Sequence, residues 1–290
     1  MVKKKRNKAP FIVRATQWTF PRLERFAPFL ARLIFKLAFY IPAKYPVPDK
    51  EKEIEKKAAR SFLEIEGKKI QIYSWGDPTR PYVLLVHGWA GRATQFRKFI
   101  QPLEDAGFRV VGFDAPAHGR SQGVKTSILE FENALKKIYL QFGPPVGLIT
   151  HSFGGGAALY AASKGLKVSK LINIAAPYVA DEILKSYLSV LAGSWESAES
   201  FKKFVLSESG KPFEEFTGLY LVQHLPHPIQ LFVVHDEDDK EMLVLHAEEL
   251  IKVYPSAKFL RTKGLGHSRI LKDEAVIGEC LKFIASSFKI

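Results

Sequence analysis

The alternation of short apolar runs with helical patterns constrains the fold of this chain more than any other feature. From about residue 67, seven runs rich in β-branched residues are separated by stretches of helical periodicity. These candidate strands are 69–75, 82–88, 109–115, 146–152, 170–176, 229–236 and 257–262. Such alternation is typical of an α/β fold, a mostly parallel sheet flanked by helices. With 290 residues the chain is long enough to bury one sizeable core of this kind.

One gap between consecutive strands is too long for a simple crossover. It runs over about 178–228 and contains the helical patterns DEILKSYLSVL and ESFKKFVLSES. Both patterns are rich in aliphatic and aromatic residues. We therefore expect a helical cap insertion that can roof a pocket.

Positive charge is concentrated at the start of the chain. Residues 1–50 hold twelve of the 43 basic residues but two of the 30 acidic ones, so the other 240 residues are close to neutral. The opening MVKKKRNKAP is not followed by the uninterrupted apolar segment of a secretory signal. The single cysteine, Cys280, cannot form an intrachain disulfide, which favours a cytoplasmic location.

The segment 22–41 predicts an amphipathic helix that carries too many charges to span a bilayer. Pro28 should start or kink this helix, and the prolines of IPAKYPVPDKE predict an extended linker after it. Two interpretations remain open. The helix docks on the protein's own body, or residues 1–41 lie on an anionic membrane surface, peripheral to the inner face of the membrane. No nucleic acid is expected as a partner, because no nucleic-acid-binding motif accompanies the basic residues.

A serine stands where a strand passes into a helix. The run VGLITHS continues into FGGGAALYAASKG, with Ser152 at the junction. A sharp strand-to-helix turn exposes its hydroxyl at the edge of the sheet and needs small neighbours, which Gly154, Gly155 and Gly156 supply. Thr150 occupies a position where glycine is usual. The pattern predicts a nucleophile elbow.

A serine nucleophile needs a base and an acid, and both are available downstream. His267 lies in the glycine-flanked loop KGLGHSRIL after the last strand, where a neutral imidazole could accept the proton of Ser152. The acid should follow the preceding strand. There the run from Asp236 offers four carboxylates, of which we choose Asp239, with Asp238 as the alternative.

Two backbone N–H groups are placed to stabilise an oxyanion. Phe153 supplies one from the elbow, and the loop after the second strand supplies the other from Trp89.

Five motifs now occur in one order along the chain: HGW, FDAPAHGRS, THSFGGG, VHDEDD and GLGHSRIL. In this order they resemble the α/β-hydrolase superfamily over roughly residues 65–290. The resemblance implies a catalytic triad of Ser152, Asp239 and His267 and an oxyanion hole from Trp89 and Phe153. It also implies an α/β-hydrolase domain over 51–290 with a variable cap at about 178–228, preceded by the basic extension 1–50. The loop FDAPAHGRS is then mainly structural, although Ala117 replaces a frequent glycine.

The remaining candidates have plainer interpretations. His87 and His118 should fix loops, His151 should point away from the nucleophile, and His235 should bond backbone. Neither a metal nor a cofactor is expected. Pro226 breaks the alignment of the two histidines in HLPHP, and no nucleotide- or flavin-binding motif is present. Cys280 should be a small buried hydrophobe.

The sequence therefore predicts a serine hydrolase, an esterase, lipase or thioesterase, that forms an acyl-enzyme. The substrate would be a small-molecule carboxylic ester or thioester with an apolar acyl group. Hydrolysis and acyl transfer are not distinguished by this pattern. The alternative is a ligand-binding or signalling protein that keeps the fold with negligible turnover, which Thr150 and the ambiguous acid favour.

Overall fold

The computed structural model describes residues 11–286, which fall into two compact units. The smaller unit combines the described part of Met1–Phe39 with Asp181–Phe213. The larger unit combines Tyr40–Ala180 with Glu214–Ile290. The helices of the N-terminal extension thus form a unit with the first part of the inserted segment. The lysine-rich start of the extension lies outside the described residues.

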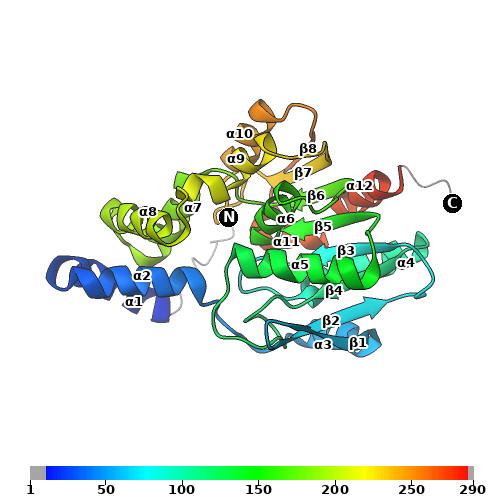
Figure 1. The fold of residues 1–290 in the computed structure, drawn as a ribbon, viewed down its shortest axis with the longest axis horizontal. Helices are drawn as coiled ribbons and strands as arrows, with labels where there is room; N and C mark the ends of the chain where they lie inside the picture. The colour runs from blue at the N-terminus through cyan, green and yellow to red at the C-terminus, as the bar shows by residue number, and fades with distance from the viewer. Residues whose placement is uncertain (1–10, 287–290) are drawn as a thin grey trace, which may run out of the picture. The chain divides into compact units, whose positions relative to one another are not determined.

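An eight-stranded sheet forms the centre of the larger unit, in the order β1-β2-β4-β3-β5-β6-β7-β8 (Figure 1). Strands β1 and β2, and β2 and β4, pair antiparallel, and the other neighbours pair parallel. The strands are β1 (Ala59–Ile65), β2 (Lys68–Trp75), β3 (Tyr82–Val86), β4 (Arg109–Phe113), β5 (Gly147–His151), β6 (Lys170–Ile174), β7 (Gln230–Asp236) and β8 (Lys258–Thr262).

Helices cover both faces of this sheet. They are α3 (Asp49–Lys57), α4 (Arg97–Asp105), α5 (Ile128–Phe142), α6 (Phe153–Ser163), α9 (Gly218–Gln223), α10 (Leu245–Val253), α11 (Gly266–Arg269) and α12 (Glu274–Ala285). Because successive strand residues face opposite ways, Leu84 and Val86 belong to one apolar cluster, with α5 and α6, while Val83 and Leu85 belong to the other, with α4 and α12. The predicted α/β architecture, a mostly parallel sheet flanked by helices, is confirmed.

Two elements, β1 and α3, were not expected from the sequence. Strand β1 lies at the edge of the sheet and only its last residue, Ile65, is buried, so it lacks the apolar alternation that marks a strand. Helix α3 occupies part of the expected extended linker. Its acidic first turn and basic last turn complement the helix dipole, although its composition is almost entirely polar.

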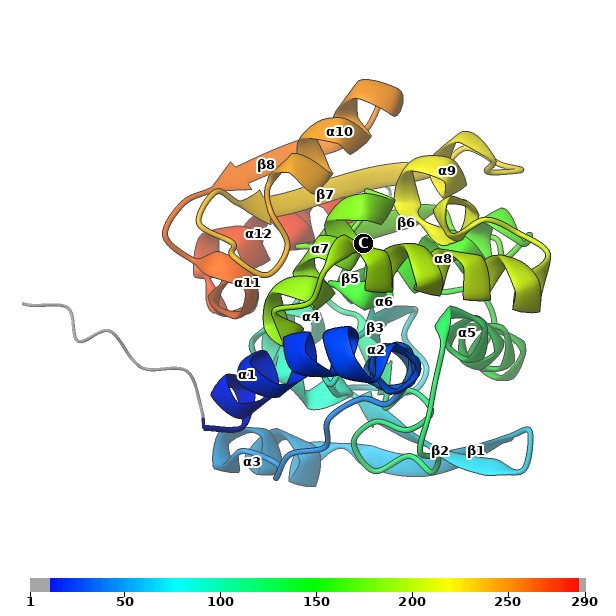
Figure 2. The ribbon, with the colours of Figure 1, turned by 90° about the vertical axis from the view of Figure 1, so that its left-hand side faces the viewer.

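The smaller unit consists of α1 (Phe11–Phe26), α2 (Pro28–Tyr40), α7 (Ala180–Leu191) and α8 (Trp195–Ser209). Figures 1 and 2 show α2 beside α8. Helix α2 begins at Pro28, as predicted. The Phe39 ring packs against the rings of Tyr187, Phe201 and Phe213, with centroid separations of 4.5, 4.3 and 5.8 Å.

Polar contacts complete the docking of the N-terminal helices on the inserted ones. The carboxylate of Glu24 accepts hydrogen bonds from the backbone N–H of Ser194 and from the hydroxyls of Ser194 and Ser197. Gln17 donates from its amide to the carbonyl of Ser189 at 3.2 Å. One side of the amphipathic segment is therefore held by the protein itself. Across residues 11–286 no helix has the length and apolar character that a membrane crossing requires.

Candidate active site

Ser152 lies at the tip of a strained turn between β5 and α6. Its backbone has φ 51° and ψ −124°, a conformation that non-glycine residues adopt at a cost, and its N–H donates to the carbonyl of Ile174 at 2.9 Å. Two glycines allow the surrounding segments to approach. A Cβ on Gly88 would lie 2.9 Å from the Cβ of Ser152, and one on Gly154 would lie 2.5 Å from the carbonyl oxygens of Val86 and His87. The close packing of three segments holds the turn.

Gly154 gives the first prediction. Gly154→Ala should lower both the stability and the activity, because the new methyl group meets two backbone oxygens that cannot move independently. Gly156→Ala is the matched control, since a Cβ there meets nothing within 4 Å. Urea unfolding should show a loss of about 1–3 kcal/mol for the first variant and little change for the second. Equal stability of the two variants would contradict this account of the elbow.

Thr150 departs from the usual glycine without disturbing the elbow. Its hydroxyl oxygen lies 2.7 Å from Oδ1 of Asn173 and 3.0 Å from the carbonyl of Ile172, both in β6. The side chain is thus directed sideways to the neighbouring strand, where its polar group is satisfied. Thr150 therefore gives no argument against a nucleophile at Ser152.

His267 is oriented by Asp239. Nδ1 of His267 lies 2.8 Å from Oδ2 of Asp239, while Oδ1 of Asp239 accepts from the backbone N–H groups of Glu241 and Met242, each at 2.9 Å. Burial disfavours the charged carboxylate, but the bonds from His267 and from the two N–H groups outweigh it and hold the pKa of Asp239 below its ordinary value. A carboxylate in this position fixes the tautomer with Nδ1 protonated and Nε2 free to accept a proton.

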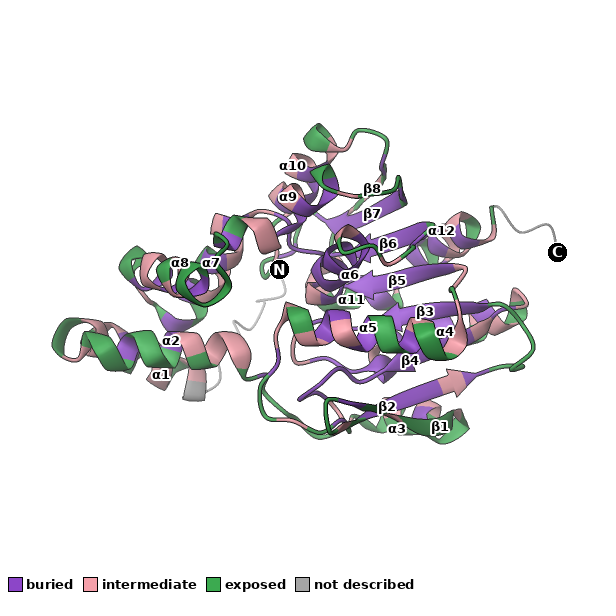
Figure 3. Ribbon diagram, in the orientation of Figure 1, coloured by how far each residue is buried: buried purple, intermediate pink, exposed green. Residues whose placement is uncertain are grey.

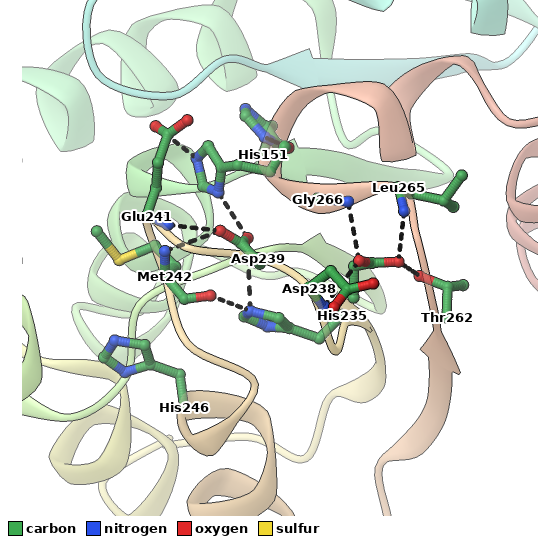
Figure 4. A network of polar contacts seen from close by, with 12 residues as sticks. His151, His235, Asp238, Asp239, Glu241, Met242, His246, Thr262, Leu265 and Gly266 are labelled. Atoms are coloured by element: carbon green, nitrogen blue, oxygen red, sulfur yellow. Dashed lines mark hydrogen bonds and ion pairs between the residues drawn. The ribbon is translucent and has the colours of Figure 1, made fainter. Parts of the chain in front are cut away.

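Asp236 and Asp238 instead accept hydrogen bonds from the backbone of the loop that carries His267. The Asp236 carboxylate accepts from the N–H groups of Leu265, Gly266 and Asp238 and from the hydroxyl of Thr262, at 2.7–3.0 Å. Figure 4 labels these four partners. Asp238 accepts from Gly264 N–H at 3.1 Å and makes no contact with His267 among residues 11–286. The structure thus brings Asp239, rather than the alternative Asp238, to the histidine.

His151 lies against the histidine of the site, which was not expected from the sequence. Its ring is 4.7 Å, centroid to centroid, from that of His267. That it points away from Ser152 stays a prediction. Burial lowers the pKa of His151 to about 3, so the ring is neutral. Nε2 then donates to the carbonyl of His267 at 2.9 Å, and Nδ1 accepts from the amide of Gln95 at 3.2 Å. His151 therefore fixes the backbone of His267, the residue that would act as base.

The backbone N–H groups of Trp89 and Phe153 are free to bind an oxyanion, since within residues 11–286 neither donates a hydrogen bond. The Trp89 ring meets that of Phe153 nearly edge-on, with centroids 5.3 Å apart. His118 Nε2 accepts from the N–H of the next residue, Ala90, at 3.0 Å, and His87 Nε2 accepts from Ala115 N–H at 2.9 Å. These two histidines fix the loops around the N–H groups.

The Ser152 hydroxyl makes no hydrogen bond to any residue in 11–286. Ser152 is 8% exposed, and Nε2 of His267 lies 4.0 Å from Oε2 of Glu241. Serine and histidine are thus not directly bonded here. Such bonds commonly tighten only when substrate binds.

The other singled-out residues lie in structural positions. His235 donates to the carbonyl of Met242 at 2.7 Å, and His224 contacts the carbonyl of Tyr220 at 2.8 Å. Cys280 is buried in α12, and burial raises the pKa of its thiol. In the described part of the chain no three His, Cys, Asp or Glu side chains gather as a metal site would require.

Buried histidines should couple stability to pH. Burial lowers the pKa of His118 to about 4, against about 6.5 in an unfolded chain. The unfolded chain therefore binds more protons below about pH 6.5, and stability falls there as the pH decreases, by at most about 1.4 kcal/mol per pH unit for one histidine. In His118→Gln the slope should be shallower, because an amide can still accept from Ala90 but does not titrate.

Urea unfolding between about pH 7 and about pH 5 measures this slope. His224→Gln is the control, because His224 is exposed. Identical slopes in wild type and His118→Gln would show that His118 is not the group that couples folding to acid.

Comparison with known proteins supports the fold that carries this site. A sequence profile of the alpha/beta hydrolase fold matches residues 81–209. The uncharacterized hydrolase YugF of Bacillus subtilis is 31% identical over 103 residues, which cover 34% of this chain and 37% of that protein. The match thus spans well under two thirds of this relative.

Solved structures extend the likeness over most of the chain. An esterase of Pyrococcus furiosus superposes with a TM-score of 0.64 at 19% identity, covering 86% of this chain and 97% of that one. A thioesterase domain from the curacin biosynthetic pathway gives 0.57 at 21% identity, covering 78% and 98%. At these identities the likeness establishes the fold.

Proposed function

We propose that the chain is a serine hydrolase of the α/β-hydrolase superfamily, which cleaves a carboxylic ester or thioester through an acyl-enzyme. One observation carries the proposal. A serine with positive φ at the end of a central strand is in the same unit as a histidine whose Nδ1 is held 2.8 Å from a buried carboxylate. This combination supplies a nucleophile, a base and the group that orients the base.

In the proposed reaction Ser152 Oγ attacks the acyl carbon while Nε2 of His267 takes its proton. The carbonyl oxygen becomes an oxyanion bound by the N–H groups of Trp89 and Phe153, each contributing about 3 kcal/mol. His267 then protonates the leaving alcohol or thiol as its bond to the acyl carbon breaks. Water, deprotonated by the same histidine, attacks the acyl-enzyme and releases the acid and Ser152. Asp239 retains its hydrogen bond to His267 throughout.

The expected substrate is a small molecule with an apolar acyl group. The rings of Trp89 and Phe153 beside the two N–H groups support this choice. We also propose a cytoplasmic location, which the single cysteine supports, and contact with the inner face of the membrane, which the basic amphipathic segment supports.

Labelling with a fluorophosphonate tests the proposal, read by intact mass on wild type and Ser152→Ala. One adduct on wild type and none on the variant is the expected result, because only an activated serine reacts with this probe. A folded wild-type protein that takes no adduct would instead favour a ligand-binding protein with negligible turnover.

A further inference from the structure

Helices α1 and α2 present a second face that the docking on α7 and α8 leaves uncovered. On α2, Ala31 and Phe35 are each 1% exposed and form the docked side. Leu33 and Leu37 lie on nearly the opposite side of the helix, at 48% and 43% exposure. Figure 3 shows that much of α2 is coloured as exposed. We call the exposed set the outer face: Trp18, Arg22, Arg25, Phe26, Phe29, Leu30, Leu33, Ile34 and Leu37.

The outer face is too apolar for an ordinary solvated helix surface. Phe26 and Phe29, at the junction of the two helices, are 76% and 68% exposed. A contiguous exposed apolar surface of this kind marks an interaction site. A nucleic acid would leave Leu33 and Leu37 without apolar partners, so the chemistry favours another occupant.

The charge of the outer face is positive only. Glu24 is the sole acidic residue in 11–41, and its carboxylate is already bonded to Ser194 and Ser197. The guanidinium of Arg22 stacks 3.8 Å above the Trp18 ring, and that of Arg25 lies 5.2 Å from the Phe26 ring centroid. A second copy packed symmetrically on this face would bring like charges together. An anionic partner fits instead.

A groove borders the same face. It lies between α2 and α8, has a volume of about 230 Å³, and is lined by residues that include Arg32, Lys36, Ser197 and Ser200. The Ser197 hydroxyl already donates to Glu24, so the groove offers two cations and the Ser200 hydroxyl, which are suited to a phosphate headgroup.

We propose that the outer face of α1 and α2 binds the surface of an anionic phospholipid bilayer. Helix α2 has 13 residues and is about 20 Å long, too short for a hydrocarbon core of about 30 Å, so it lies in the plane of the interface. The apolar side chains enter the acyl region, while the arginines and the rim of the groove contact phosphates. This proposal does not depend on catalysis at Ser152.

Co-sedimentation of the full chain with vesicles tests it. Wild type should pellet with phosphatidylcholine vesicles containing phosphatidylglycerol, only weakly with phosphatidylcholine alone, and less as salt is added. The double variant Arg22→Gln, Arg25→Gln should bind about 25-fold more weakly, at about fivefold per arginine. Leu33→Ser with Leu37→Ser should bind about tenfold or more weakly, because it removes inserted apolar area.

Matched controls carry the same changes on exposed residues of the larger unit. They are Lys98→Gln with Lys137→Gln, and Val124→Ser with Leu140→Ser, and both should bind like wild type. The rate of hydrolysis of a soluble short-chain ester should be the same in the outer-face variants, the controls and wild type, whether or not they bind vesicles. This readout separates the membrane proposal from the proposed function.

Three outcomes would overturn the proposal. Wild type could remain in the supernatant with anionic vesicles, or the outer-face variants could bind as strongly as their controls. Alternatively, light scattering could show a wild-type dimer that Leu33→Ser with Leu37→Ser converts to a monomer, without vesicle binding by either. That last result would assign the face to self-association.

Discussion

Replacing Ser152 by alanine is expected to lower kcat for ester hydrolysis by about 10⁶-fold, leaving the small rate that the oxyanion donors and binding alone provide. The hydroxyl is the one group of the proposed mechanism that forms a bond to the acyl carbon. No other serine, threonine or cysteine side chain is held at a strand-to-helix turn with positive φ among residues 11–286. No neighbour can therefore take over its role.

The double variant with His267→Ala makes this test sharper. Groups that act as one unit are strongly non-additive, so Ser152→Ala with His267→Ala should be no slower than either single variant. Ser163→Ala is the matched control. It removes a hydroxyl from the last residue of the same helix, where the group bonds only the Tyr160 carbonyl at 2.8 Å, and kcat should be unchanged.

Additive losses would mean that the two residues act independently, and retained turnover in Ser152→Ala would place the chemistry elsewhere. Equal loss in Ser163→Ala would show only that α6 is disturbed. Measuring kcat and KM separately, with the unfolding midpoint of each variant, distinguishes these cases.

The central strands of the fold could be predicted from the sequence because buried parallel strands are continuous apolar runs. Strand β6, expected at 170–176, occupies Lys170–Ile174, and β7, expected at 229–236, occupies Gln230–Asp236. Predicted ends run a few residues long where an apolar run continues into a functional loop, as after β3. Strand β1 could not be found in this way, because an edge strand with an exposed surface has no such run.

The parts of the candidate site that lie in short local motifs could be predicted from the sequence. The elbow at Ser152 depends on small residues that are adjacent in sequence. The contact of His151 with the site could not be predicted. Its partner is the backbone carbonyl of His267, 116 residues away, and every residue type has such a carbonyl. The grouping of the N-terminal helices with α7 and α8 was equally hidden, because Glu24 bonds serines 170 and 173 residues further on.

The choice of the acid that orients His267 needs the structure. Asp238 and Asp239 are neighbours of the same type, so composition and spacing left both open. The fold distinguishes them by the donor that each carboxylate accepts from: Asp239 Oδ2 faces Nδ1 of His267 at 2.8 Å, and Asp238 Oδ2 faces the Gly264 N–H at 3.1 Å.

Asp239→Asn should therefore lower kcat by about 10⁴-fold with a small change in KM, because an amide cannot hold His267 in the tautomer with Nδ1 protonated. Asp238→Asn should cost less than about tenfold, since the asparagine oxygen can still accept from Gly264. A larger loss in Asp238→Asn than in Asp239→Asn, with both proteins folded, would move the acid by one position.

Stability provides a second, independent distinction between the two aspartates. The pKa of Asp239 is held below its ordinary value, so its ionised form contributes stability at neutral pH that is lost as the pH falls through that lowered pKa. Removing the charge in Asp239→Asn should reduce this acid sensitivity. Because Oδ1 of the carboxylate also accepts from Glu241 and Met242, the asparagine must place its oxygen on these two N–H groups and turn its NH₂ toward His267. His267 can avoid facing this NH₂ with its Nδ1–H by taking the other tautomer, with Nε2 protonated. The hydrogen bond then survives and stability falls little, while the base is lost and activity falls far more.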